Sequence, residues 1–484
     1  MLTGKNFSYA VYVNGAGLLQ KLHYGERIST GDLSYLISHI GNTYVPYRED
    51  CNAGMWFDAM PLEYGFYARG DYREPTAIAE RGDGASMSRF RYVSYQIFDG
   101  VPETEGLPHA RNGGQTLSIA LKDDFSDIEI LLNYTVWDGS DVIVRNAVIC
   151  NAGKETVMLK KAYSFCMQLP EDGYRVLRLH GAWAKERCPE ITDLGHGTVR
   201  VQSLRGASSH QMNPFMGILT ERCTESEGEC YGAQLIYSGS FALTAETNCN
   251  GEVRLQGGIN EIGFGWELKG GETFTTPQAA LCYSARGLGE LSRSYADFLR
   301  EHIVDPKHVF EHRPIVVNNW EATYFDFNNE KLFAIIDEAA PLGIDTFVLD
   351  DGWFGKRDSD TSGLGDWKVN DTKLRGGLKT VIDRCKKNGL KFGLWFEPEM
   401  ISEDSDLYRA HPDWAIQKEG VDPVRGRNQL VLDFTRKEVV DYIFESVSKI
   451  LSDNDISYVK WDMNRYITEC YSQSLSAQKQ GEFM

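Results

Sequence analysis

The stretch ISYVKWDMNR, residues 456–465, decides how the second half of this chain folds. Its mainly apolar start, Ile456–Val459, predicts a short strand, and Lys460, Asp462 and Asn464 follow at alternate positions. Alternate residues of an extended segment share one face, so we expect these side chains to lie together at the strand's C-terminal end. A neighbouring cation favours an ionised carboxylate, so Lys460 is expected to keep Asp462 charged while Asn464 donates a hydrogen bond to it. The pattern predicts a fixed carboxylate nucleophile, and the alternative is a structural ion pair.

Four apolar segments upstream also end in polar or aromatic residues, and helical patterns over 329–341, 376–388 and 436–452 lie between most of them. Strands that alternate with helices form parallel sheets. Polar residues at the ends of successive strands are typical of a (β/α)8 barrel, whereas a doubly wound sheet gathers its ligands at one switch point. The segments are Pro314–Asn318 before Asn319 and Trp320, Thr346–Leu349 before Asp350 and Asp351, Phe392–Phe396 before Glu397, and Leu430–Leu432 before Asp433. We therefore predict the first five strands of a TIM barrel over residues 313–484.

Residues 1–285 have a different texture, because apolar and polar residues alternate between Gly, Asn and Asp turns. A long series of such segments predicts an antiparallel, all-β sandwich domain. Segments 127–134 and 141–148 are expected to pair as a hairpin, with Asp138 and Gly139 supplying positive φ angles in its turn. Residues 286–312 switch to helical spacing and are predicted to link the domains. The expected fold class is therefore multidomain, an all-β domain followed by a partial barrel.

The composition excludes several classes of protein. The 484 residues carry a formal net charge of -19, with 42% hydrophobic and 25% charged residues, which argues for a globular protein and against nucleic acid or an anionic membrane as a partner. Neither a membrane span nor a signal peptide is recognisable. The ten cysteines lack metal-binding spacing, and serine hydrolase, zinc protease and dinucleotide-binding motifs are absent. We expect a cytoplasmic protein without a metal or an organic cofactor.

Asp350 and Asp351 directly follow a predicted strand. Two adjacent carboxylates repel each other and need hydrogen-bond donors, and the hydroxyl groups of a sugar are suitable donors. Trp353, just beyond them, can offer a flat face for stacking on a sugar ring. Two alternatives stay open: a metal site that draws on the acidic loop 358–366, and an Asp that caps a helix.

The remaining strand ends carry further candidates for a sugar site. Trp320 and Trp395 are candidate aromatic walls, with a place in the core as the alternative for Trp320. Glu397 and Glu399 lie near the predicted barrel mouth and either face a ligand or anchor neighbouring loops. Arg427 is expected to reach a substrate hydroxyl or a catalytic carboxylate, unless it is a solvated loop charge.

Five motifs in this chain resemble bacterial α-galactosidases of glycoside hydrolase family 36. They are NNWEATYFDFN, VLDDGWFGKRD, GLGDW, KFGLWFEPEM and YVKWDMNR, in the family's order across residues 313–465. In the N-terminal part the resemblance is weaker and rests on residues 61–64 and the β-rich texture. It implies an N-terminal β-supersandwich, a catalytic (β/α)8 barrel, a C-terminal β domain and often a homotetramer. The implied activity is retaining hydrolysis of terminal α-galactosyl residues of the melibiose and raffinose type.

The resemblance also implies roles for individual residues. Asp462 matches the nucleophile, and Asp350 and Asp351 match the pair that holds galactose hydroxyls, the 4-OH and 6-OH among them. Trp320 and Trp395 match aromatic walls of the pocket. The residues that match polar ligands of the substrate are Arg427, Lys460 and Asn464. By the same analogy, the loop around Glu49–Asp58 reaches a neighbouring subunit's site.

One expectation concerns the end of the chain. The family's acid/base residue is an Asp on a strand beyond the nucleophile, and it would fall after Met484. We therefore expect a truncated chain that is inactive alone and carries half of a retaining pair. Other readings remain open: a non-catalytic galactoside-binding fragment, an α-N-acetylgalactosaminidase, a galactosyl transferase, or an unrelated metal-dependent barrel hydrolase.

Overall fold

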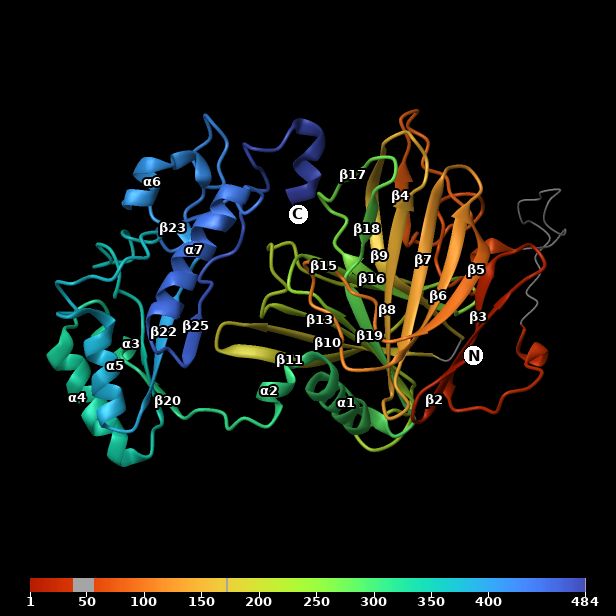
Figure 1. Cartoon of the computed structure of the whole chain (residues 1–484). Coiled ribbons are helices and arrows are strands. Elements are labelled where there is room, and N and C mark those ends of the chain that lie inside the picture. The colour runs from red at the N-terminus through yellow and green to blue at the C-terminus, as the bar shows by residue number, and fades with distance from the viewer. Residues whose placement is uncertain (38–55, 171–172, 484) are drawn as a thin grey trace. The chain divides into compact units, whose positions relative to one another are not determined.

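The computed structural model describes residues 1–37, 56–170 and 173–483, and the chain divides into two compact units, Met1–Phe310 and Glu311–Phe483 (Figure 1). Each unit has its own hydrophobic core. In the described ranges, no helix has the length and apolar character needed to cross a membrane.

The first unit is built from antiparallel strands in three sheets. The smallest contains β1 (Leu2–Thr3), β2 (Phe7–Val13) and β3 (Leu19–Glu26). The ten-stranded sheet has the order β11 (Lys185–Asp193), β10 (Arg175–Ala182), β13 (Met212–Leu219), β14 (Cys230–Ile236), β19 (Gln278–Ser284), β8 (Val142–Asn151), β7 (Ile128–Val136), β6 (Gln115–Asp123) and β5 (Phe90–Asp99), with β18 (Thr273–Thr275) beside β8. The six-stranded sheet has the order β12 (Gly197–Gln202), β15 (Phe241–Thr247), β16 (Val253–Ile259), β9 (Val157–Leu169) and β17 (Trp266–Leu268), with β4 (Ala77–Glu80) beside β9. The predicted all-β architecture is confirmed.

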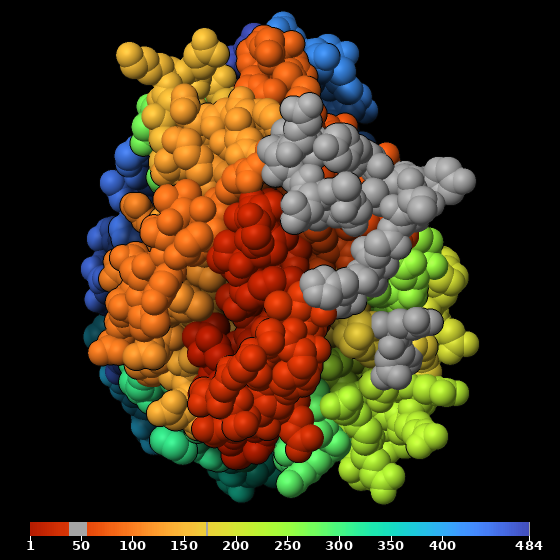
Figure 2. Space-filling view, turned by 90° about the vertical axis from the view of Figure 1, so that its right-hand side faces the viewer, coloured from red at the N-terminus to blue at the C-terminus, as the bar shows by residue number. Residues whose placement is uncertain are grey.

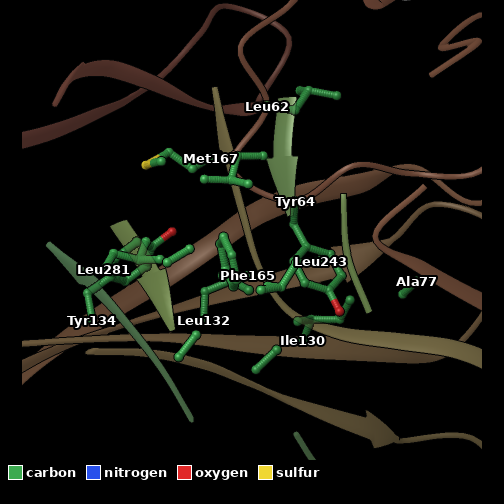
Figure 3. Close-up of a cluster of buried hydrophobic side chains, with 14 of the residues drawn as sticks. Leu62, Tyr64, Ala77, Ile130, Leu132, Tyr134, Phe165, Met167, Leu243 and Leu281 are labelled. Atoms are coloured by element: carbon green, nitrogen blue, oxygen red, sulfur yellow. The ribbon is translucent and has the colours of Figure 1, made fainter. Parts of the chain in front are cut away.

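The core of the first unit forms where the two larger sheets face each other. Side chains from both pack together, among them Leu132 of β7 and Phe165 of β9 (Figure 3). Alternating apolar positions explain this, because every second side chain of a strand points to the same face. The N-terminal segment, red in Figure 2, lies on the surface of this unit.

The predicted hairpin is present, but its turn differs from the expectation. Strands β7 and β8 pair antiparallel, with Val136 opposite Ile143. Neither Asp138 nor Gly139 has a positive φ angle. The turn closes instead with a hydrogen bond from the N–H of Ser140 to the carbonyl of Trp137 at 3.1 Å. A loop of this length accommodates an ordinary turn, so the left-handed geometry of a two-residue hairpin is not required.

The helical segment predicted as a linker packs as part of the first unit. It forms α1 (Gly287–Phe298), the π-helical turn η3 (Leu299–Ile303) and α2 (Pro306–Val309). Leu291, Tyr295 and Phe298 lie on one face of α1 and pack against the ten-stranded sheet. The spacing of the apolar residues thus correctly predicted a helix, and its buried face joins it to the β domain.

The second unit is built around a parallel sheet. The sheet order is β20 (Val316–Asn318), β21 (Thr346–Leu349), β22 (Lys391–Phe396) and β25 (Tyr458–Trp461). The main helices are α4 (Asn329–Ala339), α5 (Gly377–Lys387) and α7 (Lys437–Asp453), with the short helices α3 (Trp320–Thr323) and α6 (Asp406–Ala410). Helices α4 and α5 lie against each other beside the sheet (Figure 1). This is the strand–helix alternation predicted for a partial (β/α)8 barrel.

The segment Leu430–Leu432 is not a strand of this parallel sheet, which corrects the expectation of five. Its residues Leu430–Val431 form β24, which pairs antiparallel with β23 (Met400–Ile401). Strand β22 pairs directly with β25, so the described part of the barrel sheet has four strands. The segment is apolar because all three of its side chains are buried in the core. A short buried run has the same composition in either setting, so sequence alone could not distinguish them.

The parallel register brings four strand ends to one edge of the sheet. Asn318 of β20 lies opposite Val348 of β21, Leu349 lies opposite Leu394 of β22, and Phe396 lies opposite Trp461 of β25. The polar residues that follow these strands therefore gather at a single edge. In barrels of this kind the functional residues occupy that edge.

Candidate active site

Asp462 follows β25 directly and is held firmly in place. Its backbone N–H donates to the carbonyl of Phe396 at 2.8 Å, which continues the ladder between β22 and β25. Its carboxylate Oδ2 accepts hydrogen bonds from Trp395 Nε1 at 3.0 Å and from Asn464 Nδ2 at 2.7 Å. Across the described residues, no donor is within hydrogen-bonding distance of Oδ1. The half-buried carboxylate is therefore anchored by one oxygen and can offer the other to a ligand.

Lys460 forms its ion pair with Asp350, which corrects the expected pairing with Asp462. The two strand ends involved, those of β25 and β21, are separated in the sheet by β22. Lys460 Nζ nonetheless lies 2.8 Å from Asp350 Oδ2. Trp395 is directly opposite Lys460 in the register and supplies the donor for Asp462 instead. The expected hydrogen bond from Asn464 to Asp462 is present.

Asp350 is almost completely buried and fully engaged. Oδ2 accepts from Lys460 and from Asn318 Nδ2 at 2.9 Å, and Oδ1 accepts from the N–H of Asp351 at 2.9 Å. The N–H of Asp350 itself donates to Asn319 Oδ1 at 2.8 Å. A buried carboxylate needs a cation and hydrogen-bond donors to remain charged, and here the protein supplies both.

Asp351 is neutralised by a separate cation, Arg357. The guanidinium donates from Nε and Nη2 to the carboxylate at 2.8–3.2 Å and from Nη1 to the carbonyl of Ser362 at 2.9 Å. Both side chains are buried. Burial raises the pKa of Asp351, while the hydrogen bonds and charge of Arg357 oppose that rise. Two adjacent carboxylates can thus coexist because each has its own cation.

The two predicted aromatic walls occupy different environments. Trp320 is half-buried at the start of α3, with Tyr324 and Phe325 packed edge-on against it. Trp395 is 1% exposed, and Phe354 stacks parallel to its ring. Trp395 therefore contacts the site through its N–H and has no open ring face in the described structure. Trp353 is also fully buried and donates from Nε1 to the carbonyl of Trp395 at 2.9 Å, so the expected stacking face is not available.

Glu397 directly follows β22 and lies close to the proposed nucleophile, with which it interacts electrostatically. Its Oε1 accepts from the N–H of Asn464 at 2.7 Å and from Gln429 Nε2 at 3.1 Å. Burial raises its pKa to about 7, and the negative charge of Asp462 adds to the effect. Glu399, two residues on, accepts from Trp461 Nε1 at 2.9 Å. Both glutamates hold neighbouring segments in place, which is the loop-anchoring role that the sequence left open.

Arg427 lies in an exposed loop just before β24. Its Nη2 is 3.6 Å from Asp360 Oδ1, and its backbone is in the left-handed region with a φ of 52°. Arg465 holds this loop in place, because its Nη1 donates to the carbonyls of Val424 at 2.9 Å and Gln429 at 2.6 Å. The loop is therefore anchored to the segment that follows Asp462.

Two residues of this site carried no clear signal in the sequence: Arg357 and Gln429. Arg357 lies among Lys356 and Asp358 and looks like part of a solvated charged loop. Its one hint was the doubled carboxylate six residues earlier, which needs a nearby cation. Across the described residues, no group of three or more His, Cys, Asp or Glu is arranged to hold a metal ion.

The N-terminal loop assigned by resemblance to a neighbouring site is only partly within the described structure. Residues 49–55 lie outside the described residues. The following residues form the short 3-10 helix η2 (Phe57–Ala59), in which Phe57 and Ala59 are buried.

Two family models match the chain, in the order of its two units. The glycosyl hydrolase family 36 N-terminal domain matches residues 17–269, and Melibiase matches residues 273–484. The bifunctional alpha-galactosidase/sucrose kinase AgaSK of Mediterraneibacter gnavus is 43% identical over 474 residues, which cover 97% of this chain and 51% of that protein. Alpha-galactosidase Mel36A of Lactobacillus acidophilus is 41% identical over 488 residues, which cover 99% and 66%. The chain thus spans about half to two thirds of the length of these relatives.

Solved structures show the same likeness. The alpha-galactosidase of Lactobacillus brevis superposes with a TM-score of 0.97 at 39% identity, over 100% of this chain and 66% of that one. A variant of alpha-galactosidase AgaA from Geobacillus stearothermophilus, solved in complex with raffinose, gives a TM-score of 0.97 at 38% identity, over 100% and 68%. With both family models matched and these relatives covering nearly all of its length, the chain belongs to glycoside hydrolase family 36.

Proposed function

We propose that this protein is a glycosidase that hydrolyses terminal α-galactosyl residues of melibiose- and raffinose-type sugars with retention of configuration. The observation that carries the proposal is the geometry of Asp462, anchored through Oδ2 by Trp395 and Asn464 while Oδ1 accepts no hydrogen bond from the described residues. A carboxylate fixed in this way is suited to nucleophilic attack on an anomeric carbon. Family membership and the alpha-galactosidase relatives support the substrate class.

The reaction has two steps. In the first, Asp462 Oδ1 forms a bond to the anomeric carbon as the glycosidic bond breaks, and the leaving oxygen takes a proton from an acid. In the second, water attacks the same carbon, gives up a proton to the conjugate base and releases Asp462. A retaining pair of carboxyl groups is roughly 5–5.5 Å apart. Asp462 supplies one member of that pair, and the resemblance assigns the other to an Asp on a later strand.

The remaining strand-end residues are proposed to bind the galactosyl group. Asp350 and Asp351 are assigned to its hydroxyl groups, because each carboxylate is fixed by a cation and a carboxylate oxygen can accept more than one hydrogen bond. Lys460, which pairs with Asp350, and Asn464, which donates to Asp462, are proposed as further donors to the substrate. Trp320 is assigned to the apolar face of the sugar ring, and Arg427 to a substrate hydroxyl after it releases Asp360. Trp395 is proposed to line the pocket through its N–H.

Hydrolysis of p-nitrophenyl α-galactoside by the intact protein, with the β-anomer as control, tests this function. The Asp462→Asn variant keeps the size of the side chain and is expected to lose turnover by several orders of magnitude. An α-galactosyl fluorosugar that accumulates as a glycosyl-enzyme should label Asp462, as found by peptide mass spectrometry. Labelling of another residue, or hydrolysis of the β-anomer alone, would refute the assignment.

A homo-oligomeric, cytoplasmic enzyme is proposed as the setting of this activity. The oligomer follows from the resemblance, which implies a homotetramer. The location is supported by the cysteines of the described residues, which are free thiols of the kind that a reducing compartment maintains. Light scattering of the purified protein tests the first point, and fractionation of the source cells tests the second. A monomer, or activity in the culture medium, would contradict them.

A further inference from the structure

A single buried oxygen joins the strand end of the proposed nucleophile to the loop that carries Arg427. Glu397 Oε1 accepts from the N–H of Asn464 at 2.7 Å and from Gln429 Nε2 at 3.1 Å. Asn464 then donates from Nδ2 to Asp462 at 2.7 Å. Gln429 pairs with Gly426 across the turn that contains Arg427. Both donors converge on one acceptor, so a displacement of Glu397 would displace both segments.

We propose that Glu397 is a positioning residue of the α-galactosidase reaction, which fixes Asn464 against Asp462, anchors the Arg427 loop and places a negative charge close to the nucleophile. This inference rests on the proposed function and deepens it. Glu397 is buried and its Oε1 is taken up by Asn464 and Gln429, so we assign it a role through these neighbours and not a contact with the substrate. Its partners come from different parts of the chain, which a purely local anchor would not require.

The charged groups around Glu397 make its ionisation relevant to the reaction. Asp462, just beyond β25, raises the pKa of Glu397, and Glu399, two residues after Glu397, also interacts with Asp462. Lys460 is engaged with Asp350, and the guanidinium of Arg465 binds the carbonyls of Val424 and Gln429. No described cation pairs with Glu397. The pKa of Glu397 is about 7, so its charge changes within the working range of an ordinary enzyme.

The sign of the effect follows from the first chemical step. Asp462 loses negative charge as it bonds to the anomeric carbon, which relieves its repulsion from an ionised Glu397. Positive charge that develops on the sugar is also stabilised by a nearby anion. Ionised Glu397 is therefore expected to accelerate the step, and neutral Glu397 to keep the hydrogen bonds without that acceleration.

The experiment compares Glu397→Gln, Glu397→Leu and the control Glu403→Gln in the intact protein, with kcat/KM for p-nitrophenyl α-galactoside measured from pH 5 to 8. Glu397→Gln keeps the acceptor oxygen and cannot ionise. At pH 5 the kcat/KM of this variant should match that of the parent within about threefold. The ratio of parent kcat/KM to variant kcat/KM should then rise on the order of tenfold as the pH passes through 7. Glu397→Leu removes the acceptor and should lower kcat on the order of 100-fold at every pH. Glu403 is exposed, paired with Arg425 and has a lowered pKa, so its variant should give a flat ratio.

The outcomes separate the two ideas. If the parent is active and the ratio of its kcat/KM to that of Glu397→Gln does not change with pH, the inference is overturned and the proposed function stands. A parent that hydrolyses no α-galactoside overturns the proposed function, and the inference falls with it. If Glu397→Leu fails to fold, as judged by circular dichroism and melting, the pH dependence of Glu397→Gln decides alone.

Discussion

Lys460 Nζ lies 2.8 Å from Asp350 Oδ2 and so joins the ends of two strands that are not neighbours in the sheet. The same edge holds a second ion pair, Asp351 with Arg357, in which both side chains are buried. Each of the two adjacent carboxylates is thus balanced by a cation from a different segment. The arrangement fixes the strand ends relative to one another before any ligand binds, and pre-ordered polar groups of this kind favour catalysis.

Lys460→Met should destabilise the protein moderately. Asp350 is 2% exposed and would lose its cation while keeping the hydrogen bonds from Asn318 and from the N–H of Asp351. Removing one partner of a buried pair costs about 3–5 kcal/mol, and the partial exposure of Lys460 reduces this to about 2 kcal/mol. Guanidinium unfolding measures the change. Lys379→Met, which breaks an exposed pair with Asp383 on α5, is the control and should leave the free energy of unfolding unchanged.

Arg357→Met should be more damaging than Lys460→Met, because both partners of that pair are buried. We expect a loss of about 3–5 kcal/mol in the free energy of unfolding at pH 7. Without the guanidinium, the pKa of Asp351 in the folded protein rises further above its unfolded value. The protonated carboxyl then stabilises the fold at low pH, and this stabilisation is lost as the pH rises. The deficit should therefore shrink on acidification. Arg357→Lys should remain clearly destabilised, since an ammonium cannot reproduce the two-pronged contact. A deficit independent of pH would contradict this account.

The sequence predicted the strand ends well and their partners poorly. Asp350 and Asp351 follow the buried strand β21, and Asp462 follows the more exposed strand β25. Both strands are recognisable as short apolar segments along the chain, so the gathering of these residues at one edge could be predicted. Which cation meets which carboxylate depends on the curvature of the sheet and on the reach of a long side chain. The sequence placed Lys460 beside Asp462, and the fold sends it to Asp350.

Burial was the second quantity that the sequence could not supply. Trp353 and Trp395 lie in motifs that match a sugar site, and both side chains are within the core. Arg357 shows the opposite case, because its charged neighbours in the sequence suggest an exposed loop whereas its side chain is buried. Whether a residue beyond a strand end points inward depends on loops such as 354–366, which have no periodic pattern. The segment Leu430–Leu432 is a similar case, because an apolar, buried segment does not reveal which strand it pairs with.

Glu397→Gln should change the pH dependence of stability in a defined direction. The pKa of Glu397 is about 7 in the folded protein, above the ordinary value of 4.5. Because the pKa is higher in the folded protein, this carboxyl contributes fully to the free energy of unfolding below its unfolded pKa. That contribution is lost as the pH rises toward the folded pKa of about 7. The variant cannot ionise, so its stability relative to the parent should increase from pH 5 to pH 8, by up to about 3 kcal/mol.

Melting temperatures of the two proteins across this pH range check the prediction for Glu397. The other titrating groups are common to both proteins, so the difference between the melting temperatures isolates this carboxyl. A difference that stays constant, or that falls with pH, would contradict a raised pKa.

Arg145→Met should strongly destabilise the first unit, because it leaves a carboxylate alone in the β-sandwich core. Arg145 Nη2 lies 3.0 Å from Glu63 Oε2, and both side chains are buried. Tyr9 and Tyr134 also donate to Glu63, and Arg145 donates to the carbonyl of Cys166. Breaking such a pair costs about 3–5 kcal/mol.

The double variant Glu63→Gln/Arg145→Met distinguishes an unpaired charge from lost packing in this core. The glutamine side chain introduced at position 63 keeps an acceptor for the two tyrosines and carries no charge, so the double variant should be more stable than Arg145→Met alone. Chemical unfolding followed by circular dichroism measures both. Arg178→Met is the control, since Arg178 pairs with a half-exposed Glu190 and should cost less than about 1 kcal/mol. A double variant less stable than the single one would show that packing, and not the buried charge of Glu63, accounts for the loss.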